Sequence, residues 1–118
     1  MYEPSRLLDS FHIKGFKNYD GAQELEKLKV GKRLDLIPEY DNPYDPSAIR
    51  IERKGVKLGY VPKEKNYLMS LFAFYGHADV FECRIQQIDP EAAPWSQVRV
   101  GIFIKDARKR EEAPKDCA

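Results

Sequence analysis

The chain has 118 residues, enough for one small domain with a single core and too few for two. Hydrophobic residues make up 42% of it and charged residues 33%, a composition that excludes a disordered chain. The 20 basic and 19 acidic residues leave a net charge of +1, which argues against a protein that coats long nucleic acid by bulk electrostatics. A local pocket that reads one or two nucleotides remains compatible with this charge.

The two cysteines give no sign of a disulfide framework or a metal site. Cys83 lies in an apparent strand and Cys117 in a polar tail, and the chain has no Cys-x-x-Cys or Cys/His ligand spacing. The opening residues 1–6 lack a secretory pattern, and no apolar stretch approaches the roughly 18 residues of a membrane span. We therefore expect a soluble protein in the reducing cytoplasm, without a cofactor or a bound metal.

Alternation of apolar and polar side chains predicts most of the secondary structure. It indicates strands at 11–16, 32–39, 48–53, 57–61, 81–86 and 98–105. A turn at Lys54-Gly55 would join the third and fourth of these strands in a hairpin.

Two segments follow helical spacing, at 22–29 and 62–75. In the second, Pro62 suits a first helical turn and Gly76 suits the residue after a helix. Asn66 is an alternative cap that would shorten this helix by one turn. The helical spacing falls on the side chains of Leu68, Leu71, Phe72 and Tyr75.

Five to six short strands with one substantial helix predict a mainly β (α+β) domain, built as a small, strongly bent antiparallel sheet or barrel. We expect an N-terminal extension at residues 1–9, the barrel at 10–105, and a charged, mobile tail at 106–118.

The loop that precedes the third predicted strand carries the most specific pattern, running from Asp41 to Ile49. Pro43 and Pro46 fix their own backbone and restrict the residues before them. Such a loop can present Tyr44 and Asp45 in one fixed arrangement. The alternative is a purely structural turn, since Asn, Asp and Pro are favoured at turns for their backbone chemistry alone.

Four blocks in order resemble the HIRAN domain family: Ile13-Lys14-Gly15-Phe16 with Tyr19 behind it, Asp41-Asn42-Pro43-Tyr44-Asp45 with Ala48-Ile49, Leu58-Gly59-Tyr60-Val61-Pro62, and Asn66 opening an apolar helix. The resemblance covers roughly residues 10–105. It implies a modified OB-like β-barrel that binds the 3′ end of single-stranded DNA.

The resemblance also implies roles for individual residues. Tyr44 would stack on a terminal base, Asp45 would accept a hydrogen bond from the free 3′-hydroxyl, and Asn42 would contact a base edge or sugar. Lys17 and Lys63 match positions where the family places basic groups near phosphates.

Three further positions concern the aromatic walls of the pocket. Asn18 falls where a helicase-like relative carries a second stacking aromatic, so half of the aromatic sandwich is missing unless Tyr19 supplies it. Tyr60 is either a core residue or a wall of the pocket.

The function predicted from the sequence is a non-enzymatic DNA-binding module with a role in DNA repair or replication-fork processing. The expected partners are a single-stranded DNA 3′ end and a helicase or nuclease acting in trans; we expect a monomer and no membrane partner. Two alternatives stay open. One is a protein-interaction module whose groove accepts a peptide strand. The other is a metal-dependent phosphodiesterase that would use Glu39, Asp41 and Asp45.

Overall fold

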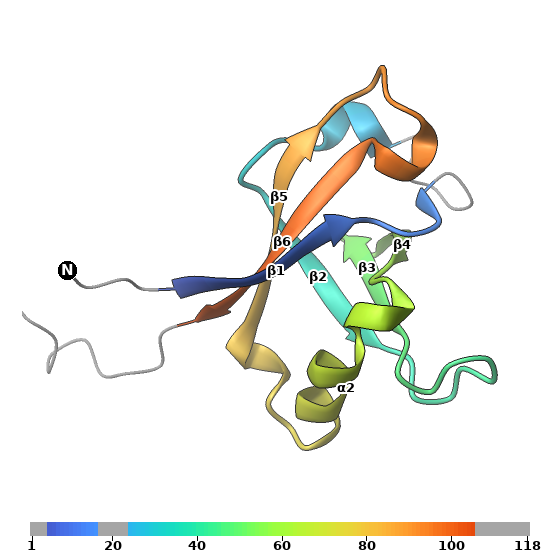
Figure 1. The fold of residues 1–118 in the computed structure, drawn as a ribbon, viewed down its shortest axis with the longest axis vertical. Coiled ribbons are helices and arrows are strands. Elements are labelled where there is room, and N and C mark those ends of the chain that lie inside the picture. Colours follow the sequence, from blue (N-terminus) through green and yellow to red (C-terminus); the bar gives the residue numbers. More distant parts are fainter. Residues whose placement is uncertain (1–4, 17–23, 106–118) are drawn as a thin grey trace, which may run out of the picture.

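The computed structural model describes residues 5–16 and 24–105 of the chain. The described strands are β1 (Ser5–His12), β2 (Arg33–Pro38), β3 (Ile49–Arg53), β4 (Val56–Tyr60), β5 (Phe81–Ile88) and β6 (Val98–Lys105). They are accompanied by the helix α2 (Tyr67–Phe74) and by the short 3-10 turns η2 (Leu25–Lys27), η3 (Lys63–Lys65), η4 (Ala78–Val80) and η5 (Pro94–Ser96). The predicted mainly β domain with one helix is confirmed (Figure 1).

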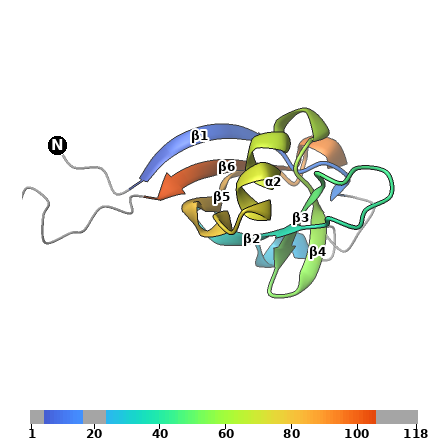
Figure 2. The same cartoon turned by 90° about the horizontal axis from the view of Figure 1, so that it is seen from below.

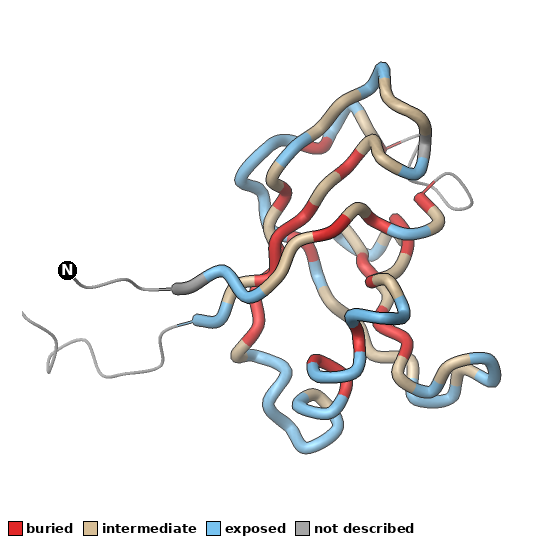
Figure 3. Tube along the Cα trace, viewed as in Figure 1, coloured by how far each residue is buried: buried red, intermediate tan, exposed pale blue. Residues whose placement is uncertain are grey.

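The strands form one sheet in the order β1-β6-β5-β2-β3-β4, and every pair in it is antiparallel. Alternation places the apolar side chains on the inner face, because successive residues of a strand point to opposite sides. Cys83 pairs with Ile102, and Ile85 and Phe11 both pair with Val100. All five side chains are buried and belong to one core. Figure 3 shows the buried stretches along the strands of the sheet.

The sheet curls so far that its two edges touch. The segment after β1 forms a bridge with the end of β4, in which Lys14 and Tyr60 exchange two backbone hydrogen bonds of 2.9 Å. Register shifts in β1, β4 and β5 mark bulges, which bend strands and increase their twist. The result is the curled, OB-like half-barrel seen in Figure 2.

The long predicted helix is shorter than 62–75. The turn η3 precedes α2, and Asn66 stands at the N-cap between them, as in the alternative that shortens the helix. Gly76, with φ +88°, follows the helix in the left-handed conformation that glycine tolerates. The buried side chains of α2 are Met69 and Ser70, whereas Leu68 and the other residues at helical spacing are at least one-third exposed.

Two other predicted elements are wrong in extent. The first strand is Ser5–His12 rather than 11–16, because β1 pairs along the full length of β6, from Ser5 opposite Lys105 to His12 opposite Arg99. Of the helix predicted at 22–29, residues 22 and 23 lie outside the described residues, Glu24 is helical, and the turn η2 follows it. The chain turns extended at Leu28, whose side chain is buried in the core.

The described residues contain no helix with the length and apolar character needed to cross a membrane. Cys83 is a buried free thiol, and burial raises its pKa to about 12. The predicted tail at 106–118 lies outside the described residues.

Candidate functional site

An open groove of about 390 Å³ lies where the loop 39–48, the end of β4 and the start of α2 meet. Its lining includes five of the eight predicted site residues: Asn42, Tyr44, Asp45, Tyr60 and Lys63. The other lining residues are Lys14, Gly15, Ala48, Val61 and Asn66. The remaining predicted site residues, Lys17, Asn18 and Tyr19, lie outside the described residues.

The groove's aromatic wall is set by the side chain of Asn42. Its Oδ1 accepts hydrogen bonds from the backbone N–H groups of Tyr44 (2.8 Å) and Asp45 (3.1 Å). This Asx turn fixes the backbone on both sides of the Tyr44 ring, which is 89% exposed. Both lone pairs of the Asn42 amide oxygen are thus in use, so Asn42 acts mainly as the organiser of the loop.

The Asp45 carboxylate is held at both of its oxygens. Oδ1 accepts the backbone N–H of Ser47 at 2.9 Å, and Oδ2 accepts Nδ2 of Asn66 at 2.9 Å. An ionised carboxylate can accept about four hydrogen bonds, so roughly half of its capacity remains for a ligand. The acid is therefore oriented by its neighbours without being saturated.

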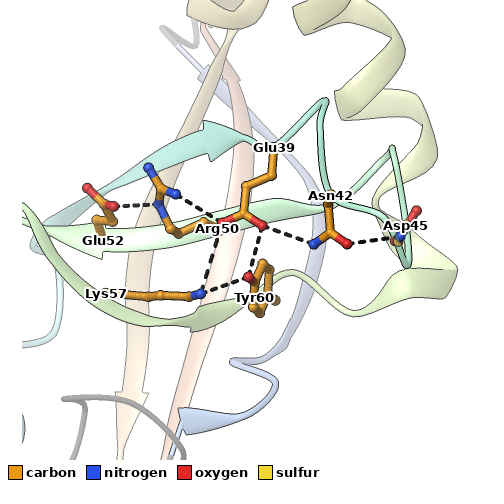
Figure 4. A network of polar contacts seen from close by, with 7 residues as sticks. All are labelled: Glu39, Asn42, Asp45, Arg50, Glu52, Lys57 and Tyr60. Atoms are coloured by element: carbon orange, nitrogen blue, oxygen red, sulfur yellow. Dashed lines mark hydrogen bonds and ion pairs between the residues drawn. The ribbon is translucent and has the colours of Figure 1, made fainter.

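Behind the loop lies a polar network centred on the Glu39 carboxylate (Figure 4). Glu39 accepts hydrogen bonds from Tyr60 Oη (2.9 Å), Asn42 Nδ2 (3.0 Å) and Arg50 Nη1 (3.0 Å). Burial alone would raise the pKa of Glu39, but the hydrogen bonds from Tyr60, Asn42 and Arg50 outweigh it and lower that pKa. The charged carboxylate thus connects β2 to the loop and to both strands of the hairpin.

Tyr60 is tied at its hydroxyl, so its ring forms a fixed wall of the groove. Lys57 Nζ donates to Tyr60 Oη at 2.7 Å and lies 4.4 Å from the ring centroid. Burial raises the pKa of Tyr60, and the nearby Glu39 carboxylate adds to this effect. The phenol therefore stays neutral while its hydroxyl donates a hydrogen bond to Glu39.

The Glu39 network should make the stability of the folded protein sensitive to acid. The pKa of Glu39 is lowered in the folded protein, so its contribution to stability is present above the ordinary glutamate pKa and is lost as the pH falls through the lowered folded value. Glu39→Gln should lower the free energy of unfolding at pH 7 by about 1–3 kcal/mol, because hydrogen bonds to a charged group are lost. Urea denaturation at several pH values measures both effects.

The control for this prediction is Glu64→Gln, which changes an exposed glutamate of η3. Relative to wild type and this control, Glu39→Gln should lose less additional stability between pH 6 and pH 3. An equal loss of stability between pH 6 and pH 3 in all three proteins would show that Glu39 is not the source of the pH dependence.

The carboxylates of the phosphodiesterase alternative do not converge on one point. The Glu39 side chain is bound to Arg50 and Tyr60, whereas Asp45 is bound to Ser47 and Asn66. Within residues 5–16 and 24–105, no group of three or more His, Cys, Asp or Glu side chains is placed to hold a metal ion.

Three polar or charged residues of the site were not among the predicted site residues. Asn66 and Lys14 line the groove, and Glu39 organises the loop behind it. The spacing of three residues between Glu39 and Asn42 was the one local signal for this organising contact. Asn66 lies 21 residues from Asp45 and Lys14 lies 46 residues from Tyr60, so their positions depend on the closed sheet.

Comparison with known proteins identifies the family and the fold of this chain. The model of the HIRAN domain matches residues 9–105, most of the chain. No curated protein matches the chain.

Two solved structures share the fold. A protein from Lactobacillus plantarum, structural genomics target LpR91B, has a TM-score of 0.70 and 22% sequence identity, with 85% of this chain and 94% of that chain covered. The HIRAN domain of human HLTF has a TM-score of 0.56 and 18% identity, with 87% of this chain and 82% of that chain covered.

Proposed function

Because this chain belongs to the HIRAN domain family, we propose that its groove binds the 3′ end of single-stranded DNA. HIRAN domains are DNA-binding modules, and membership supports a nucleic-acid-binding role for this chain. The observation that carries the finer proposal is the exposed Tyr44 ring, whose backbone is fixed next to the half-occupied Asp45 carboxylate.

Tyr44 supplies the stacking surface. Its ring projects from a loop whose backbone is held by Asn42 and restricted by Pro43 and Pro46. Binding therefore breaks little side-chain packing and costs little ordering of the loop. A base stacked on an aromatic side chain contributes about 1–3 kcal/mol and any base suffices, because each has a π-face. Tyr60 provides the second aromatic wall among the described residues of this groove.

Asp45 supplies the selection for a free hydroxyl. A hydroxyl that donates to a carboxylate forms a short, charge-assisted hydrogen bond. The same carboxylate repels a terminal phosphate, so the site discriminates by penalty as well as by attraction. The remaining acceptor positions of Asp45 are sufficient for one such bond.

Lys14 and Lys63 supply the contacts to the sugar-phosphate backbone. Both line the groove; Lys14 precedes Tyr60 in the sequence and Lys63 follows it. Two lysines that neutralise one or two phosphates give a shallow salt dependence, with a slope of about −0.7 per phosphate for single strands. This agrees with a chain whose net charge is only +1.

A module of this kind marks DNA ends and leaves their chemistry to another protein. We place it in DNA repair or replication-fork processing, where a helicase or nuclease acting in trans works on the end that it holds. A short groove with one exposed ring and one acid suits recognition of a terminus better than tracking of a long strand.

The test compares affinities for labelled oligonucleotides that differ only at the 3′ end, carrying a hydroxyl or a phosphate. Wild type should prefer the hydroxyl, and Asp45→Asn should reduce that preference about tenfold, because it removes a charge-assisted hydrogen bond and a phosphate-repelling charge. Fluorescence anisotropy with the label at the 5′ end measures both affinities.

The matched control is Asp41→Asn, the same substitution at an exposed position of the same loop outside the groove. It should keep the wild-type preference. Equal binding of the two ends by wild type would refute 3′-hydroxyl recognition. Binding that requires a free 5′ end would assign the groove the opposite polarity.

A further inference from the structure

The side chain of Asn66, at the start of α2, does not cap the helix. Asn66 stands at the N-cap, where an asparagine side chain ordinarily accepts a hydrogen bond from the first turn of the helix. Its side chain makes no such bond. Nδ2 instead donates across the groove to Asp45 Oδ2 at 2.9 Å, and Asn66 is only 2% exposed.

This contact completes a two-point attachment of Asp45. The backbone N–H of Ser47 holds Oδ1 and the Asn66 amide holds Oδ2, so rotation of the carboxylate about its Cβ–Cγ bond is fixed. Its remaining acceptor positions then point in set directions. Without Asn66, one oxygen keeps its anchor and the other is released.

The chemical nature of the tether matters as much as its position. An amide donates a hydrogen bond without carrying charge, whereas lysine or arginine in this place would neutralise the carboxylate. The negative charge of Asp45 therefore remains available to attract a hydroxyl donor and to repel a phosphate.

We propose that Asn66 is the specificity-determining residue of the groove, which positions Asp45 so that a free terminal hydroxyl is bound in preference to a phosphate. This inference rests on the proposed function, since it concerns how the same groove distinguishes two ends. Asn66 acts through Asp45 and is thus a positioning residue.

The experiment is a double-mutant cycle with Asn66→Ala, Asp45→Asn and the double variant. The measured quantity is the ratio of the dissociation constants for oligonucleotides that end in a 3′-phosphate and in a 3′-hydroxyl. Asn66→Ala should lower this ratio about fivefold, the effect of one net hydrogen bond. In the Asp45→Asn background the same change should leave the ratio unaltered, because Asn66 then has no charged carboxylate to position.

Two further variants separate specificity from folding. Ser70→Ala removes another buried polar side chain of α2, one turn beyond Asn66 and outside the groove lining, and should keep the wild-type ratio. If Asn66→Ala does not fold, as judged by circular dichroism and thermal melting, Asn66→Ser replaces it, with a smaller cavity and the same expected direction.

The outcomes distinguish this inference from the proposed function. If wild type has no preference for the hydroxyl end, the proposed function fails. If wild type has the preference and Asn66→Ala retains it, or if Asn66→Ala lowers the ratio equally in both backgrounds, the role of Asn66 is refuted while the proposed function stands.

Discussion

Replacing Tyr44 by alanine should weaken the binding of single-stranded DNA by about 5- to 150-fold, which corresponds to the 1–3 kcal/mol that stacking contributes. The stability of the fold should hardly change, because the ring is 89% exposed and supports no part of the core. Tyr44→Phe should retain most of the affinity, since the π-face is preserved. Anisotropy titrations and thermal melting of the three proteins measure these effects.

The control for Tyr44 is Tyr75→Ala, which removes another exposed tyrosine that lies beyond α2 and outside the groove. Its affinity for DNA should equal that of wild type. If Tyr44→Ala also bound normally, stacking in this groove would be refuted. An equal loss in both variants would indicate diffuse binding by surface aromatics.

Gly59→Ala should lower the free energy of unfolding by about 3 kcal/mol or more, the upper range for overpacking at a closed site. An added Cβ would lie 2.4 Å from the backbone oxygen of Lys14 and 2.6 Å from Ile13 Cγ2. Relief of these clashes requires the segment after β1 to move away from β4. The bridge between Lys14 and Tyr60, two groove-lining residues, would then open, so DNA binding should weaken as well.

Gly55→Ala separates this clash from the cost of backbone conformation. Gly55 lies in the hairpin turn at φ +86°, and nothing lies within 4 Å of an added Cβ. Only the strain of a left-handed alanine, about 1–2 kcal/mol, is expected there. Urea denaturation of both variants measures the difference. Similar losses at the two positions would mean that the contact between the sheet edges contributes little to stability.

The parts of the fold that could be predicted from the sequence are those specified by local patterns. Strict alternation at 81–86 and 98–105 corresponds to β5 and β6, in which the buried apolar side chains recur at every second residue: Phe81, Cys83 and Ile85, and Val98, Val100 and Ile102. The Lys54-Gly55 turn joins β3 and β4, and both of its residues have positive φ, as a tight hairpin requires.

The errors come from elements whose extent depends on partners distant in the sequence. The start of β1 has little alternation of its own, and it is a strand because β6 offers an unpaired edge along its whole length. The sequence did not specify which face of α2 packs against the core, because apolar residues occur all around this helix. Met69 is buried against the core, while Tyr67, Phe74 and Tyr75 are about two-thirds exposed.

The candidate site also combines features that the local sequence specifies with contacts between distant segments. The exposure of Tyr44 follows from Asn42 and the flanking prolines, all within three residues, so the local sequence was sufficient to predict it. The tether from Asn66 to Asp45 and the bridge from Lys14 to Tyr60 join segments that meet only after the sheet has curled. No spacing rule in the sequence specifies such contacts. The family pattern includes Asn66 as a helix opener, and the structure adds its contact with the acid.

The most direct test of the groove is an amide NMR titration with a single strand of about six nucleotides that ends in a 3′-hydroxyl. The groove hypothesis predicts that the perturbed amide signals belong mainly to residues 42–48 and 58–66, and that a 3′-phosphate weakens their response. Perturbations concentrated on β1 and β6, or an equal response to both ends, would contradict it.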